Sequence, residues 1–104
     1  MLDHTIFIAS AYVFRHWAVP FSGAAEIARY VNLGVPPGSF ITALLENNLR
    51  DACTCADDLN LSNLPAYVAM LHGKAPAVCW GSPEKVAAWL AVKAQARSNK
   101  EIAQ

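Results

Sequence analysis

The run Ser82-Pro83-Glu84 constrains the fold of this chain more than any other stretch, because it combines three signals for the start of a helix. The serine hydroxyl can accept a hydrogen bond from a first-turn amide, and proline fits the first helical position, where an amide needs no partner. The glutamate carboxylate suits the positive end of the helix dipole. Trp89 and Leu90 follow on one face of the helix as apolar anchors. We therefore predict a helix that begins at Pro83 and continues to about residue 100.

A chain of 104 residues forms one domain that can bury a core without disulfides or a metal. It is 55% hydrophobic and only 15% charged, against roughly 45–50% and about 25% in average globular domains. Such a chain has more apolar surface than a monomer of this size readily hides, so we expect a surface for a partner or for self-association. The formal net charge of zero removes the simplest argument for direct nucleic-acid binding.

The three cysteines are an odd number without framework spacing, which indicates a reducing cytoplasm. The apolar run Thr5–Phe14 is too short for a membrane span, which needs roughly 20 residues. It also lacks the basic residues that precede the apolar part of a signal peptide. We therefore expect a cytoplasmic protein with no targeting segment.

The first segment is ambiguous between helix and strand. Asp3 is a plausible N-cap and Pro20 a plausible stop, but the apolar residues between them cover most of a helix circumference. The β-branched and aromatic content also allows a strand through Thr5–Phe14. We predict a helix, because no other stretch offers a strand as partner. Its aromatic group, which is a candidate interface, consists of Tyr12, Phe14 and Trp17.

The middle of the chain repeats helical stripes separated by turns. Ser22 and Ser39 are N-cap candidates, and Gly34 provides a left-handed stop. Further breaks fall at residues 47–48, 57–58 and 73, and one stripe between them includes Cys53. We predict a single domain over residues 1–104, all-α, as a compact bundle of five to six short helices. It divides into an aromatic N-terminal helix (1–20), a helical core (22–90) and an extended end of the C-terminal helix (91–104).

The cysteines and histidines do not form a metal motif. Cys53 and Cys55 lie two residues apart, about 200° around a helix, and would point to opposite sides. A structural zinc site needs two ligand pairs, and only one loose pair exists. Glycine spacings for phosphate or dinucleotide binding are missing too. We therefore expect no metal and no cofactor.

Cys79 is the best candidate for a nucleophile. It lies close to the start of the last helix, whose dipole can lower the pKa of a thiol. No histidine is paired with it in a recognisable signature, so we expect no catalytic residue and no enzyme. A small enzyme that uses Cys79 remains the weakest alternative.

Trp80, Trp89 and Tyr67 form the strongest remaining cluster. Trp89 is expected to fill the core where the last two helices meet. Trp80 stands beside a glycine in a loop and is an equal candidate for an interface anchor. Asp57 and Asp58 mark a helix boundary and an acidic surface point.

Several short motifs resemble those of a family of small proteins encoded by phages and prophages. They are ARYV (28–31), GVPPGSF (34–40), LxNNL (45–49), RxA (50–52), ADD (56–58), NLP (63–65) and CWGSPEK (79–85), where x is any residue. Together they span residues 26–90, whereas the first twenty residues do not match. The function of this family is largely unknown. The resemblance to phage proteins, together with the excess apolar surface and the absence of catalytic motifs, leads us to expect an anti-defence role in the cytoplasm of a host cell, most specifically an anti-CRISPR inhibitor that binds an effector subunit of CRISPR–Cas or another defence protein.

For this role we expect steric or allosteric blockade through a protein interface. The expected contact residues are Tyr12, Phe14, Trp17, Asp57, Asp58 and Trp80. The alternative is a homo-oligomeric helical module, such as a dimer, that sequesters a nucleotide signal or a host regulatory protein.

Overall fold

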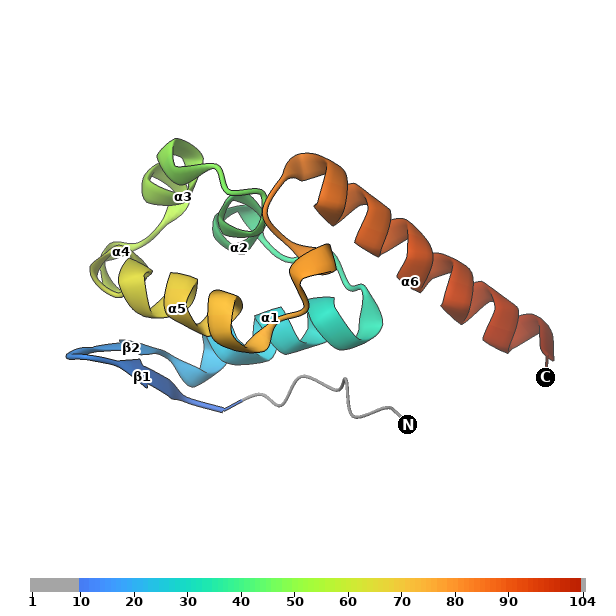
Figure 1. The fold of residues 1–104 in the computed structure, drawn as a ribbon, viewed down its shortest axis with the longest axis horizontal. Helices are drawn as coiled ribbons and strands as arrows, with labels where there is room; N and C mark the ends of the chain where they lie inside the picture. Colours follow the sequence, from blue (N-terminus) through green and yellow to red (C-terminus); the bar gives the residue numbers. More distant parts are fainter. Residues whose placement is uncertain (1–9, 104) are drawn as a thin grey trace.

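The computed structural model describes residues 10–103, and the side chains of residues 10–98. This part of the chain is mostly helical, with six α-helices packed beside one small hairpin (Figure 1). The elements are β1 (Tyr12–Phe14), β2 (Trp17–Val19), α1 (Phe21–Leu33), α2 (Ser39–Leu45), α3 (Leu49–Cys55), α4 (Asp58–Ser62), α5 (Leu64–Lys74), the 3₁₀ turn η2 (Ala77–Cys79) and α6 (Pro83–Ala103). The prediction of a compact, mostly helical domain is confirmed, but the fold is not all-α.

The predicted N-terminal helix is wrong over residues 12–19, which form an antiparallel hairpin; residues 3–9 of that helix lie outside the described residues. The strand partner that the sequence did not reveal is the segment immediately following β1. Arg15 and His16 form the connecting turn, and Arg15 adopts a φ of 57°, which is unusual for a residue with a side chain. Without a glycine or asparagine at this position, the turn carried no recognisable sequence signal.

The register of the hairpin explains its aromatic pattern. Tyr12 lies opposite Val19, and Phe14 lies opposite Trp17, so these four side chains share one face of the sheet. This face packs on the core: Val19 is buried, and the three aromatic side chains are partly buried against it. The apolar residues of this segment therefore follow the two-residue alternation of strands and not the periodicity of a helix.

Helices α1, α2 and α5 surround the main core. Its largest fully buried side chains are Tyr30, Tyr67, Ile27, Leu45, Met70, Leu71, Val19, Val31 and Cys79. Gly34 ends α1 with a φ of 70°, and its amide donates to the carbonyl of Tyr30, as predicted for a left-handed stop. Ser22 is not the N-cap of α1, because the helix begins one residue earlier, directly after Pro20. Ser39 is not an N-cap either, since it is the first residue of α2.

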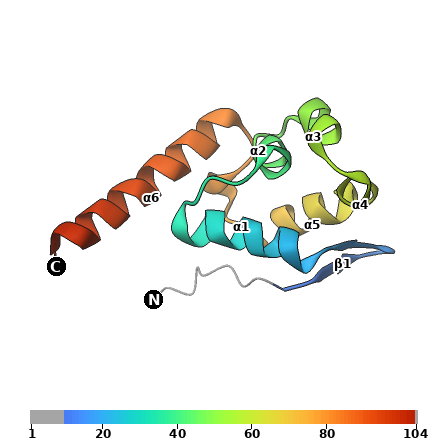
Figure 2. The ribbon, with the colours of Figure 1, turned by 180° about the vertical axis from the view of Figure 1, so that it is seen from behind.

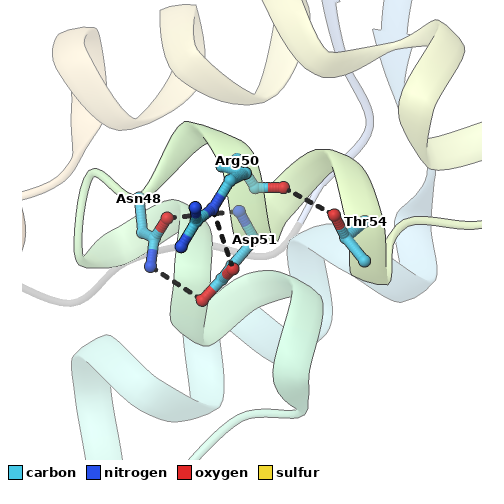
Figure 3. Close-up of polar contacts among 4 residues, drawn as sticks. All are labelled: Asn48, Arg50, Asp51 and Thr54. Carbon is cyan, nitrogen blue, oxygen red and sulfur yellow. Dashed lines mark hydrogen bonds and ion pairs between the residues drawn. The ribbon is translucent and has the colours of Figure 1, made fainter.

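Short helices α3 and α4 begin with side-chain caps. Asn48 accepts a hydrogen bond from the amide of Asp51 and donates one to its carboxylate, at 3.1 and 2.9 Å. The Thr54 hydroxyl donates to the carbonyl of Arg50, one turn earlier (Figure 3). Asp57 caps α4 by accepting from the amide of Asn60 at 2.8 Å. These local bonds let two helices of one or two turns form although they bury few side chains.

Helix α6 begins at Pro83 as predicted, and the Ser82 hydroxyl accepts a hydrogen bond from the amide of Lys85 at 3.1 Å. Its first half packs on the core through Val86 and through Trp89, whose indole nitrogen donates to a carbonyl of α1. Its second half diverges from the body in both views (Figure 1, Figure 2).

Candidate functional site

Helix α5 is apolar on both sides, although only one side faces the core. The buried side carries Ala66, Tyr67, Met70 and Leu71. A helix that is apolar all round is normally buried all round, so the second side is an exception that needs an explanation. The residues of the second side are Leu64, Pro65, Val68, Ala69, His72 and Gly73.

An open groove of about 700 Å³ lies between this second side of α5 and strand β1. Strand β1 contributes Tyr12 and Phe14, while no residue of β2 lines the groove. Both views place the hairpin beside α5 (Figure 1, Figure 2). The lining contains no acidic or permanently charged side chain, and its polar groups are limited to the Tyr12 hydroxyl and His72. A hollow of this size and composition suits apolar side chains of a ligand or partner.

Two cations stand at the ends of strand β1. The guanidinium of Arg15 lies 5.2 Å from the ring centroid of Phe14, and the ammonium of Lys74 lies 5.7 Å from that of Tyr12. Both distances are in the range of cation–π contacts, which hold the cations against the aromatic walls of the groove. The groove is therefore apolar along its length and positively charged at both ends of its β1 wall.

A second, smaller hollow of about 60 Å³ adjoins the groove through Val68, which lines both. The other lining residues are the apolar Leu44, Leu49, Ala52 and Trp80 and the polar Asn47 and Asn48. Val68 is 44% exposed and links the apolar groove to this second hollow, which reaches the loop before α6. Trp80 thus belongs to the same surface as the predicted aromatic residues of β1, from which it is far away in sequence.

Of the six residues predicted to contact a partner, Tyr12 and Phe14 line the groove and Trp80 lines the hollow that adjoins it at Val68. Trp17 shares the hairpin face and stacks with Phe14 at 6.3 Å, but it does not line the groove. The acidic pair Asp57 and Asp58 lies at the start of α4, where Asp57 serves as the helix cap. Neither aspartate lines the groove, so the predicted acidic corner is separate from it.

The residues that the sequence did not reveal as part of this surface are those on the outer side of α5, above all Leu64 and Val68. By spacing alone, Leu64 and Val68 fall on a single apolar stripe together with Tyr67 and Leu71. The available signal was the absence of any charged residue in α5 before its last turn. A core helix with one solvent face normally places charges on that face.

The cysteines do not provide a second site. Cys79 is buried, and burial raises the pKa of its thiol to about 11, opposite to the lowered value that a helix start would produce. Cys53 and Cys55 are exposed on α3, which contradicts the assignment of Cys53 to an apolar stripe. Among the residues that the structure describes, no three histidine, cysteine or acidic side chains gather as metal ligands would.

A polar hollow of about 220 Å³ lies between α1, α2 and α5. Glu26 accepts the amide hydrogen of Gly38 at 2.6 Å, and the Tyr67 hydroxyl donates to Asn60 at 2.8 Å. Burial, followed by the nearby Glu26 and Asp57, raises the pKa of Tyr67 to about 12, which keeps its hydroxyl protonated as a donor. Both bonds join segments of the fold, so we assign this hollow a structural role.

Comparison of the chain with protein-family models, with curated proteins and with solved structures gave no match. Within residues 10–103, none of the helices combines the length and the hydropathy that crossing a membrane requires.

Proposed function

We propose that this protein acts by binding another protein through the groove between β1 and α5. One observation supports the proposal most directly: the described residues cover the outer side of α5 only in part and leave its Val68 44% exposed, whereas the inner side already supplies the core. Leaving an apolar helix face exposed to water forgoes a stabilisation of about 25 cal/mol for each Å² of apolar surface that could be buried. A protein-binding role explains why this face is retained.

We further propose that the partner is a host defence protein, with an effector subunit of a CRISPR–Cas complex as the first choice. Support for this partner comes from the resemblance of residues 26–90 to small phage proteins. The inhibition would be steric or allosteric, and the aromatic side chains of β1 would contact the effector. The groove supports a protein contact in general, and the resemblance alone supports this particular partner.

A charge placed in the groove tests both the binding surface and the identity of the partner. Val68→Glu puts a carboxylate on the floor of the apolar strip at a position that is 44% exposed, so the fold should tolerate it. Val92→Glu is the matched control, because Val92 is 61% exposed on α6 and does not line the groove. Each variant is mixed with purified CRISPR effector complexes, and co-elution and target-DNA cleavage are measured.

We expect the wild type and Val92→Glu to co-elute with an effector and to inhibit its cleavage. Val68→Glu should bind at least about thirty-fold more weakly, the size of a hot-spot loss, while its circular dichroism stays unchanged. Equal binding by Val68→Glu would show that the groove is not the contact surface. Normal cleavage with every effector would exclude the anti-CRISPR role, and a dimeric mass in solution would favour the self-associating module instead.

A further inference from the structure

Strand β1 has a free edge with hydrogen-bonding groups that point outward. In an antiparallel pair, residues alternate between positions bonded to the opposite strand and positions that point away from it. Ala18 is of the second kind, because its amide donates outward to the side chain of Asn63 at 2.9 Å. Val13 lies directly opposite Ala18 in the register. The amide and carbonyl of Val13 therefore point away from β2, toward the edge that no strand of the described chain covers.

This free edge borders the apolar groove. The groove is lined by β1 and α5 and not by β2, so it lies on the side of β1 where residues 10–103 place no strand. An extended segment paired with β1 would direct every second side chain to one face of the sheet. On the inner face, these side chains would enter the groove over Leu64 and Val68. The edge supplies backbone hydrogen bonds, and the groove supplies apolar contacts for alternate residues, which is the arrangement required for β-strand addition.

The charges around β1 indicate what such a segment carries. Arg15 stands at one end of the strand and Lys74 at the other, each against an aromatic ring of the groove wall. Neither residues 10–20 nor helix α5 contains an aspartate or glutamate. Carboxylates at the two ends of an incoming segment would therefore meet cations without a competing acid on either element.

We infer that the free edge of β1 binds an extended segment of a partner protein by β-strand addition, and that this segment is apolar at alternate positions and acidic at both ends. This inference rests on the proposed protein-binding function and adds the mode of binding and the chemistry of the partner. A second copy of this chain fits less well, because pairing two β1 strands would bring the two sets of cations together.

The test uses two fluorescein-labelled peptides, EEVTITVEE and KKVTITVKK, and fluorescence anisotropy with the full chain. Their five-residue centres are about 17 Å long, enough to cover the three residues of β1. Val13→Pro removes the outward amide, and an edge strand tolerates proline where its amide faces outward. Val13→Thr is the matched control, because it keeps the amide and the β-branched shape. The double variant Arg15→Glu with Lys74→Glu reverses both charges.

We expect the acidic peptide to bind at least about ten-fold more tightly than the basic one, and the charge-reversed variant to invert this preference. Val13→Pro should weaken binding of the acidic peptide about five-fold, the loss of one hydrogen bond, while Val13→Thr stays within two-fold. Hydrogen exchange at the Val13 amide should be fast in the free protein and slower in the complex.

Three results would overturn the inference. Absence of acidic-peptide binding at about 1 mM would exclude an acidic extended segment. Unchanged binding by Val13→Pro, together with loss of binding by Val68→Glu, would leave the groove as a binding site but exclude strand addition. Slow exchange at Val13 in the free protein would show that the edge is already covered, either by residues 1–9 or, if the mass is dimeric, by a second copy.

Discussion

Gly23 in the first turn of α1 faces the hydroxyl end of Tyr67, and replacing this glycine with alanine should destabilise the fold. A Cβ at position 23 would overlap the Tyr67 hydroxyl oxygen and lie 2.8 Å from its Cζ. Tyr67 has little room to withdraw, because it is 1% exposed and packs edge-on against Phe40 at 5.1 Å. Displacement would also disturb its hydrogen bond to Asn60.

The magnitude follows from three opposing contributions. Alanine is better than glycine in a helix by about 0.5–1 kcal/mol. Overpacking of a filled core costs typically about 1–3 kcal/mol, and loss of the hydroxyl hydrogen bond costs about 1 kcal/mol. The unfolding free energy of Gly23→Ala should therefore fall by about 1–3 kcal/mol, which corresponds to a fall in Tm of about 5–15 °C.

Thermal and urea unfolding, followed by circular dichroism, measure this change. Gly73→Ala is the control, because a Cβ at position 73 would find its nearest atom, the Tyr12 hydroxyl oxygen, at 4.0 Å. This variant should be as stable as the wild type or up to about 1 kcal/mol more stable. Gly23→Ala combined with Tyr67→Phe should be less destabilised than the sum of the two single variants. If Gly23→Ala alone unfolded at or above the wild-type temperature, the argument from close packing would be refuted.

Three further predictions concern local features of the fold. Ser82→Ala removes the acceptor for the Lys85 amide and should lower the free energy of unfolding in urea by about 1 kcal/mol; an unchanged midpoint would contradict the capping role. Gly34→Ala forces a side chain into a φ of 70° and against Lys93, and should cost about 2 kcal/mol in a thermal melt; a neutral result would mean that α1 can end differently. Burial raises the pKa of Cys79 from 9.0 to about 11, so the unfolded chain releases this proton first, and stability is complete below pH 9 and decreases as the pH rises toward 11. Between pH 8 and pH 10, urea unfolding should show a loss of stability that is about 1 kcal/mol larger in the wild type than in Cys79→Ala. Tyr30 and Tyr67, whose pKa values are raised as well, add to the loss in both proteins; equal slopes in the two proteins would contradict this assignment.

The helix boundaries that were predictable depend on local chemistry. Ser82 and Pro83 specify the start of α6, and Gly34 specifies the end of α1. Each residue meets a hydrogen-bonding or conformational requirement of the backbone within a few residues of itself. The hairpin depends on tertiary packing, which local sequence patterns do not reveal. Its turn places Arg15 at positive φ without glycine or asparagine, and its strands are three residues long. Packing against α5 stabilises this conformation, and such tertiary stabilisation overrides weak local preferences.

The groove was only half predictable for a related reason. The sequence singles out Tyr12 and Phe14, which line the groove, because aromatic residues on a poorly amphipathic segment indicate an interface, although the same sequence predicts a helix there. The spacing of their neighbours on α5 predicts a core position for them, since one apolar stripe is sufficient to explain that helix. Only the three-dimensional arrangement shows that Tyr67 and Leu71 already fill the core side and leave Val68 outside. A helix without charge before its last turn, at the edge of a small domain, therefore presents two apolar sides. The sequence shows the second side only after the residues that fill the core have been identified.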